Sequence, residues 1–111
     1  MKLERTVKTE SNEISICERL ATYFALAGYR QTISQPRLMS YQRGKFLTLS
    51  AKGCKVNAII QVSPVPDQAM QVTVTLDIDT SGQFVIERER EYWRKEMDDI
   101  EQAILGLPPL A

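Results

Sequence analysis

The chain has 111 residues, a length that fits one domain whose core needs neither disulfide nor metal. Its 14 basic and 14 acidic residues give a formal net charge of zero, and it has two cysteines and no histidine. These counts exclude a zinc site made from cysteine and histidine, and any catalytic triad that depends on histidine.

Hydropathy gives a first expectation about location. No apolar run reaches the roughly 20 residues of a transmembrane helix, and residues 1–5 have no apolar leader segment behind them. We therefore expect a cytoplasmic protein with no membrane span.

The charges are unevenly distributed along the chain. No acid lies between Glu18 and Asp67, a stretch whose basic residues are Arg19, Arg30, Arg37, Arg43, Lys45, Lys52 and Lys55. Residues 82–105 instead have seven acids against four bases, a net charge of −3. This pattern predicts a mildly basic middle and an acidic C-terminal helix.

The first two predicted elements are a strand and a helix. Residues 2–9 are predicted to form an edge strand, because Leu3 and Val7 share one face and charges occupy the other. Residues 12–27 are predicted to form a helix that Ser11 or Asn12 caps, ending at Gly28. Its apolar stripe consists of Ile16, Leu20, Phe24 and Ala27, widened by Ile14, Cys17 and Ala21.

The middle of the chain is predicted to be a series of strands. Residues 29–33 and 37–43 are predicted strands, separated by a turn or extended segment at Pro36. A tight turn at 43–45, centred on Gly44, is expected to lead into a return strand at 46–51. Residues 52–53 indicate a second turn.

Two stronger strands follow. Residues 55–62 alternate, with their apolar side chains on one face, and Pro64 ends the strand because proline cannot donate to a ladder. Residues 70–78 alternate most regularly, with Val72, Val74, Leu76 and Ile78 on the buried face. A sheet with one solvent-exposed face and one buried face is typically antiparallel, so we expect an antiparallel sheet.

The last predicted element is a long helix. A capping-box pattern at 80–83 places its start near Ser81, although residues 84–86 could instead form one more strand. Its apolar stripe consists of Ile86, Trp93, Met97, Ile100 and Ile104. Gly106 and the following prolines end it, and residues 106–111 are expected to be a mobile tail.

Together these elements predict an α+β fold in one domain over residues 1–111. The order is β-α-β-β-β-β-α, with an antiparallel sheet of five or six strands. The sheet has one apolar face, so both helices are expected to pack on that face.

This element order resembles the TBP-like and helix-grip architectures, in which the C-terminal helix crosses the concave face of a curved sheet. The segments 41–44 (YQRG), 75–83 (TLDIDTSGQ) and 87–93 (EREREYW) also resemble a small family of uncharacterised bacterial proteins, mainly cyanobacterial. The resemblance implies a fold. It implies no activity, cofactor or site residues.

A first candidate ligand site lies on the C-terminal helix. Arg90 borders the apolar stripe on the helical wheel, so with Trp93 and Met97 it could bind an anionic or apolar ligand at the mouth of a cleft between helix and sheet. The simpler interpretation is that the Arg90 stem covers apolar surface, and that Trp93 and Met97 are core residues.

A second candidate lies in the basic middle. Basic and aromatic side chains interleaved on a sheet are typical of single-stranded nucleic acid binding, and Arg37, Tyr41, Arg43 and Lys45 show this pattern. The zero net charge and a pI of about 6.3 argue against nucleic acid as a partner.

Metal binding and thiol chemistry are weaker candidates. Asp77 and Asp79 could hold Mg²⁺ or Ca²⁺ with Asp67, but the pattern is better explained as a solvated sheet face, and we expect no metal and no cofactor. Cys54 could be a reactive thiol, yet no histidine is available to activate it, so an inert thiol is the better interpretation.

We therefore expect a protein that is not an enzyme, because histidine is the usual general base near neutral pH. The leading hypothesis is a binding or protein-interaction module. It could form a homodimer through its edge strand or outer sheet face, where Met39, Leu47 and Ile59 are expected to be exposed. The alternative is a carrier that holds a small ligand in a cleft under the C-terminal helix.

Overall fold

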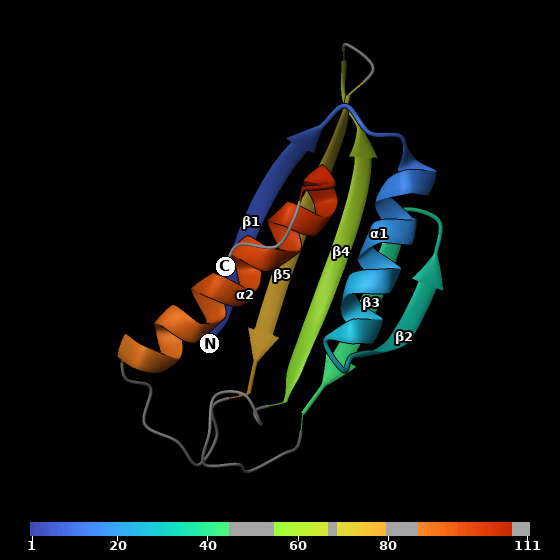
Figure 1. Ribbon diagram of the computed structural model, residues 1–111. Coiled ribbons are helices and arrows are strands. Elements are labelled where there is room, and N and C mark those ends of the chain that lie inside the picture. The colour runs from blue at the N-terminus through green and yellow to red at the C-terminus, as the bar shows by residue number, and fades with distance from the viewer. Residues whose placement is uncertain (45–54, 67–68, 80–86, 108–111) are drawn as a thin grey trace.

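The computed structural model describes residues 1–44, 55–66, 69–79 and 87–107. These residues form five strands and two helices in the predicted order (Figure 1). The elements are β1 (Lys2–Thr9), α1 (Glu13–Leu26), β2 (Arg30–Gln35), β3 (Leu38–Arg43), β4 (Val56–Pro64), β5 (Met70–Ile78) and α2 (Glu87–Leu105).

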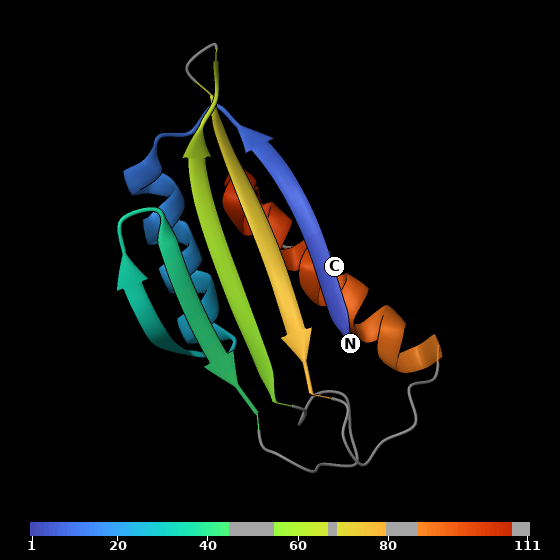
Figure 2. The same cartoon turned by 180° about the vertical axis from the view of Figure 1, so that it is seen from behind.

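The strands form one sheet in the order β1-β5-β4-β3-β2, and every neighbouring pair is antiparallel. Figure 2, seen from behind, has the sheet in front and both helices beyond it. Both helices therefore cover the same face, and the predicted α+β fold with two helices on one face is confirmed. Helix α2 crosses the sheet obliquely over β1 and β5, while α1 lies beside β4 and β3 (Figure 1).

The core lies between the sheet and the helix layer. Alternate residues of β4 and β5 point into it, and those residues are Val56, Ala58, Ile60, Val62, Val72, Val74, Leu76 and Ile78. Helix α2 adds Trp93, Met97, Ile100 and Ile104, as its stripe predicts. Each large apolar side chain buried in this way stabilises the fold by about 1.5–3 kcal/mol, which explains why the period of the pattern determines the sheet's buried face.

Helix α1 begins as predicted and buries less of its surface than predicted. Asn12 is the cap, because its side-chain oxygen accepts a 2.8 Å hydrogen bond from the Ser15 amide. The prediction that Ile14 and Ala21 widen the buried stripe is wrong, since Ala21 is exposed and Ile14 is 71% exposed. Both lie about 140–160° from Ile16 at 100° per residue, on the side away from the sheet.

The hairpin between β2 and β3 turns at Pro36 and Arg37. Proline fixes a negative φ, and Arg37 takes a φ of 65°, a combination that type II turns use. Strand β2 runs from Arg30 to Gln35, one residue later at its start and two residues further than the predicted strand. Several other predictions concern segments outside the described residues: the return strand at 46–51, the start of the last helix near Ser81 and the alternative strand at 84–86.

The end of α2 is fixed by backbone hydrogen bonds of its own and by hydrogen bonds from Arg19 of α1. Gly106 has a φ of 72°, the left-handed conformation expected of a glycine just after a helix. The Leu107 amide donates to the Gln102 carbonyl at 2.9 Å, so residues 106 and 107 are hydrogen-bonded to the helix end. Residues 108–111 lie outside the described part of the chain.

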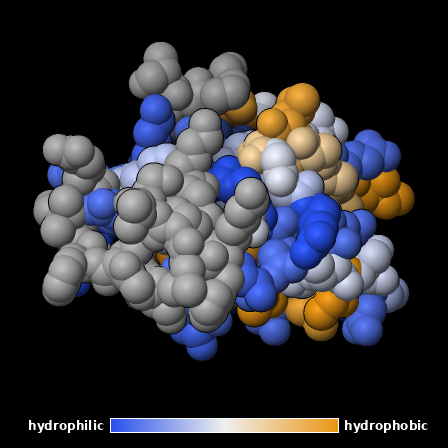
Figure 3. Space-filling view, turned by 90° about the horizontal axis from the view of Figure 1, so that it is seen from below, coloured by the Kyte–Doolittle hydropathy of each residue, from blue (hydrophilic) through white to orange (hydrophobic). Residues whose placement is uncertain are grey.

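The prediction that Met39 is exposed on the surface is wrong. Met39 is buried, because it alternates with Tyr41 on the inner face of β3 and pairs with Ile60. Ile59 is half-buried on the outer face, and Leu47 is outside the described residues. Figure 3 shows apolar patches separated by hydrophilic residues on the visible described surface. No described helix is long and apolar enough to cross a membrane.

Candidate functional site

The first set of predicted site residues is divided between core and solvent. Arg90 is exposed on α2. Trp93 and Met97 are only 1% and 3% exposed and pack in the core. The residues therefore line no common surface, and Trp93 and Met97 have the core role that was the simpler interpretation.

The second set is also dispersed. Arg37 is exposed at the hairpin turn, where its Nε lies 3.5 Å from Glu13 Oε1. The Tyr41 ring is buried and stacked on Phe24, with ring centroids 4.3 Å apart. A ring held in this way has no free face for a base. Lys45 lies outside the described residues, and Arg43 turns inward to a different environment.

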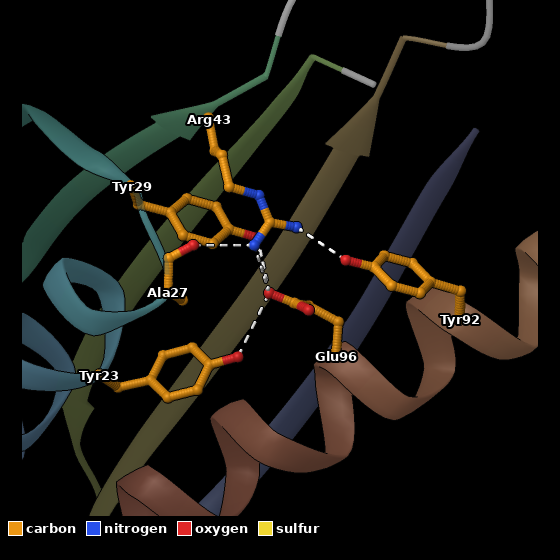
Figure 4. A network of polar contacts seen from close by, with 6 residues as sticks. All are labelled: Tyr23, Ala27, Tyr29, Arg43, Tyr92 and Glu96. Atoms are coloured by element: carbon orange, nitrogen blue, oxygen red, sulfur yellow. Dashed lines mark hydrogen bonds and ion pairs between the residues drawn. The ribbon is translucent and has the colours of Figure 1, made fainter. Parts of the chain in front are cut away.

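Arg43 belongs to a cluster of polar side chains that bridges the two helices (Figure 4). This Arg43–Glu96 cluster comprises Tyr23, Tyr29, Arg43, Tyr92 and Glu96. Arg43 Nη1 lies 3.5 Å from Glu96 Oε1, with the two side chains only 15% and 10% exposed. The hydroxyls of Tyr23 and Tyr29 donate to the same carboxylate oxygen at 3.2 and 3.0 Å.

Three further contacts fix the Arg43 guanidinium in the cluster. Its Nη1 donates to the Ala27 carbonyl at 3.0 Å, and its Nη2 donates to the Tyr92 hydroxyl at 3.3 Å. Its central carbon lies 4.5 Å from the centroid of the Tyr29 ring, within cation–π range. The cluster therefore connects the end of β3, the end of α1 and the middle of α2.

The electrostatics of the cluster favour neutral tyrosines around one ion pair. Burial and the Glu96 carboxylate raise the pKa of Tyr23 and of Tyr29 well above the ordinary value. Burial would lower the pKa of Arg43, but neighbouring Tyr29, Glu96 and Tyr92 more than offset this and raise it. Both phenols therefore stay protonated and able to donate at physiological pH.

The cluster was missed from the sequence because its partners are far apart along the chain. Two signals in the sequence point to it. Arg43 continues the inward alternation of Met39 and Tyr41, which places a cation on the apolar face of a strand. Glu96 lies about 60° from Trp93 on the helical wheel, at the margin of the apolar stripe.

A groove lies next to this cluster, between the two helices, and it encloses about 540 Å³. We call it the interhelical groove. Its wall on α1 consists of Glu18, Arg19, Thr22, Tyr23 and Leu26. Its other wall, formed by α2 and the residues after it, consists of Asp99, Gln102, Ala103, Gly106 and Leu107. Tyr23 belongs to both the groove and the Arg43–Glu96 cluster.

The groove has an unusual share of exposed apolar side chains. Leu26 is 85% exposed and Leu107 is 51% exposed, and both line it. In the described part of the chain, the other exposed large apolar side chains are Ile14 and Ile33, which lie elsewhere. Two leucines exposed around one concave surface are what a binding groove for an apolar partner requires.

One residue that lines the groove has an unsatisfied polar atom. Asp99 Oδ1 is buried and has no hydrogen-bond partner. The neighbouring Tyr23 hydroxyl cannot supply a donor, because it already donates to Glu96. A buried carboxylate oxygen without a partner costs free energy. The Asp99 side chain also lines the groove, so its carboxylate could accept a hydrogen bond from a ligand there.

The described residues also include candidate metal ligands and a cysteine thiol. No three cysteine, aspartate or glutamate side chains within them are grouped so that they could hold a metal ion. Asp77 lies on the outer face of β5, and Asp67 and Cys54 are outside the described part. Burial and Glu13 raise the pKa of the half-buried Cys17 thiol, which makes it a poor nucleophile at neutral pH.

Comparison with known proteins gives no further assignment. A scan against protein-family models finds no match, and no curated protein matches the chain. The resemblance to a cyanobacterial family therefore stays a prediction.

Proposed function

We propose that this protein is a non-enzymatic interaction module that binds a segment of another protein in the interhelical groove. The observation that carries the proposal is the groove itself, a volume of about 540 Å³ with Leu26 and Leu107 exposed around it. Burying Leu26 under a partner would contribute about 1.5–3 kcal/mol, and burying the half-exposed Leu107 about half as much.

Two observations support a binding role over a catalytic one. The chain has no histidine, so the most common general base is absent. Glu96, the most deeply buried carboxylate among the described residues, is occupied by Arg43 and two phenols, which leaves it poorly placed to move protons. The groove, by contrast, is held in shape before any ligand arrives, because Tyr23 is fixed by Glu96 and Arg19 is bonded to the end of α2.

The test is selection of a displayed library of random peptides against the purified protein. We expect selected peptides to bind the wild type and to lose at least about tenfold in affinity for Leu26→Glu, which places a charge in the apolar groove. Ile14→Glu is the matched control, since Ile14 is an exposed apolar residue of the same helix outside the groove. Peptides that bind both variants equally well would show that the groove is not the binding site.

A small-ligand carrier is the second candidate, because the groove volume lies within the range of small-molecule pockets, about 300–1,000 Å³. This groove lies between the helices, whereas Trp93 and Met97, on the buried side of α2, are packed in the core. Native mass spectrometry of protein purified from its source separates the two candidates. A retained small molecule that Leu26→Glu releases would favour the carrier.

A further inference from the structure

The charges in the interhelical groove limit which partner it can accept. The groove is lined by two acids, Glu18 and Asp99, and one base, Arg19. Among the described residues neither acid forms an ion pair. Asp99 is the more informative, because its Oδ1 is buried without any hydrogen-bond donor.

The one base of the groove already has its partners. Arg19 Nε donates to the Ala103 carbonyl at 3.0 Å, and Arg19 Nη2 donates to the Ile104 carbonyl at 2.6 Å. These carbonyls end α2, where the helix dipole is negative, so the Arg19 charge is balanced locally. The acids Asp99 and Glu18 therefore remain for an incoming group, and a cation satisfies a carboxylate better than a neutral donor does.

The shape of the groove favours a helix. Its wall on α1 runs from Glu18 to Leu26, about 12 Å along the axis, which equals roughly two helical turns. An extended peptide needs backbone partners at a strand edge, and the facing helices offer none, because their backbone groups pair within each helix or, at the end of α2, with Arg19. A helical segment satisfies its own backbone and presents side chains at the spacing that a groove between helices accepts.

From these observations we infer that the groove binds a basic amphipathic helix of a partner protein. Its apolar side chains lie against Leu26 and Leu107, and a lysine or arginine pairs with Asp99. The inference rests on the proposed function and adds the chemistry of the partner. A second copy of this chain fits poorly, because the segment 82–105 has a net charge of −3 and would bring like charges to the acids of the groove.

The experiment uses a displayed library of helical peptides with their outward positions randomised, selected against the full-length protein. We expect the selected peptides to combine apolar residues at helical spacing with at least one lysine or arginine. Asp99→Asn should weaken synthetic versions of these peptides about 10-fold to 100-fold, the usual value of a hydrogen bond to a charged group. The Asp99→Lys variant should bind a peptide whose basic residue is replaced by glutamate more tightly than it binds the original peptide.

Asp98→Asn is the matched control. Asp98 is the neighbouring carboxylate on α2, it pairs with Arg5 at 2.6 Å, and it does not line the groove. One outcome would overturn the inference and leave the proposed function standing. In that outcome the selected peptides need Leu26 but lack a basic residue, and Asp99→Asn weakens their binding no more than Asp98→Asn does. Peptides indifferent to Leu26→Glu would instead remove the proposed function.

Discussion

Replacing Glu96 by leucine removes the acceptor at the centre of the Arg43–Glu96 cluster and leaves the rest of the cluster in place. Arg43 then keeps only the Ala27 carbonyl and the Tyr92 hydroxyl, with its side chain 15% exposed. The hydroxyls of Tyr23 and Tyr29 lose their acceptor as well. We expect a severe loss of stability, because the largely buried Arg43 loses its counter-charge and two phenol donors lose their acceptor.

The magnitude follows from the geometry. Charges 3.5 Å apart attract by about 5 kcal/mol at an effective dielectric constant near 20. Most of this gain offsets desolvation of the pair, so the pair itself contributes little, yet breaking it costs about 3–5 kcal/mol. For a domain of this size that is a fall of about 12–20 °C in Tm. The double variant Arg43→Met with Glu96→Leu should recover about 2–3 kcal/mol.

The assay is denaturant unfolding followed by far-ultraviolet circular dichroism and by the fluorescence of Trp93, the single tryptophan. Trp93 reports on the cluster directly, since its ring centroid lies 5.8 Å from the central carbon of Arg43. Glu96→Gln serves as the control that keeps an oxygen acceptor for the tyrosines and removes only the charge. A loss below about 1 kcal/mol for Glu96→Leu would refute the argument, because that is the value of a solvent-exposed pair.

Three further predictions concern pH, the groove and the end of α2. The pKa of Tyr29 is raised above its ordinary 10.0, so its contribution to stability is fully present below about pH 10. Above that pH the contribution of Tyr29 should fall by about 1.4 kcal/mol per pH unit, and Tyr23, whose pKa is also raised, adds to the slope. Alkaline unfolding measures this slope, and Tyr29→Phe should reduce it by about that amount. Asp99→Asn should raise the free energy of unfolding by about 1 kcal/mol, because it neutralises a half-buried carboxylate whose Oδ1 is buried without a hydrogen-bond partner, and a loss measured by denaturant unfolding would count against this. Gly106→Ala should cost about 1–2 kcal/mol in the same assay, since φ is 72° and the new methyl would lie 3.3 Å from the Arg19 guanidinium carbon.

The sheet could be predicted from the sequence because its pattern has a physical cause at every position. Residues 70–78 alternate between apolar and polar side chains, and a shift of one residue would place every valine in water. Strand β5 therefore spans Met70–Ile78, the predicted range. Helix α1 was harder, because Ile14 looks like a core residue by type and only the helical wheel shows that it faces away from the sheet.

The candidate site could not be predicted in the same way, because it depends on how two helices lie against each other. Local sequence suggests that Arg43 is a basic surface residue, since no acid lies near it in the chain. Its partner Glu96 comes from the last helix and meets it only through packing. Leu26 likewise looks like an ordinary helical leucine until α2 is placed beside it and leaves a concave surface between them.

Asp99 offers the strongest distinction between a structural and a functional role for the groove. In the free protein its buried oxygen lacks a partner, so neutralising it should stabilise the fold. In the complex the Asp99 carboxylate would be paired with a cation, so neutralising it should weaken binding. If Asp99 served packing alone, replacing it would lower the stability of the protein or leave binding unchanged. Opposite signs for stability and affinity in the single variant Asp99→Asn are what a binding site maintained at the expense of stability requires.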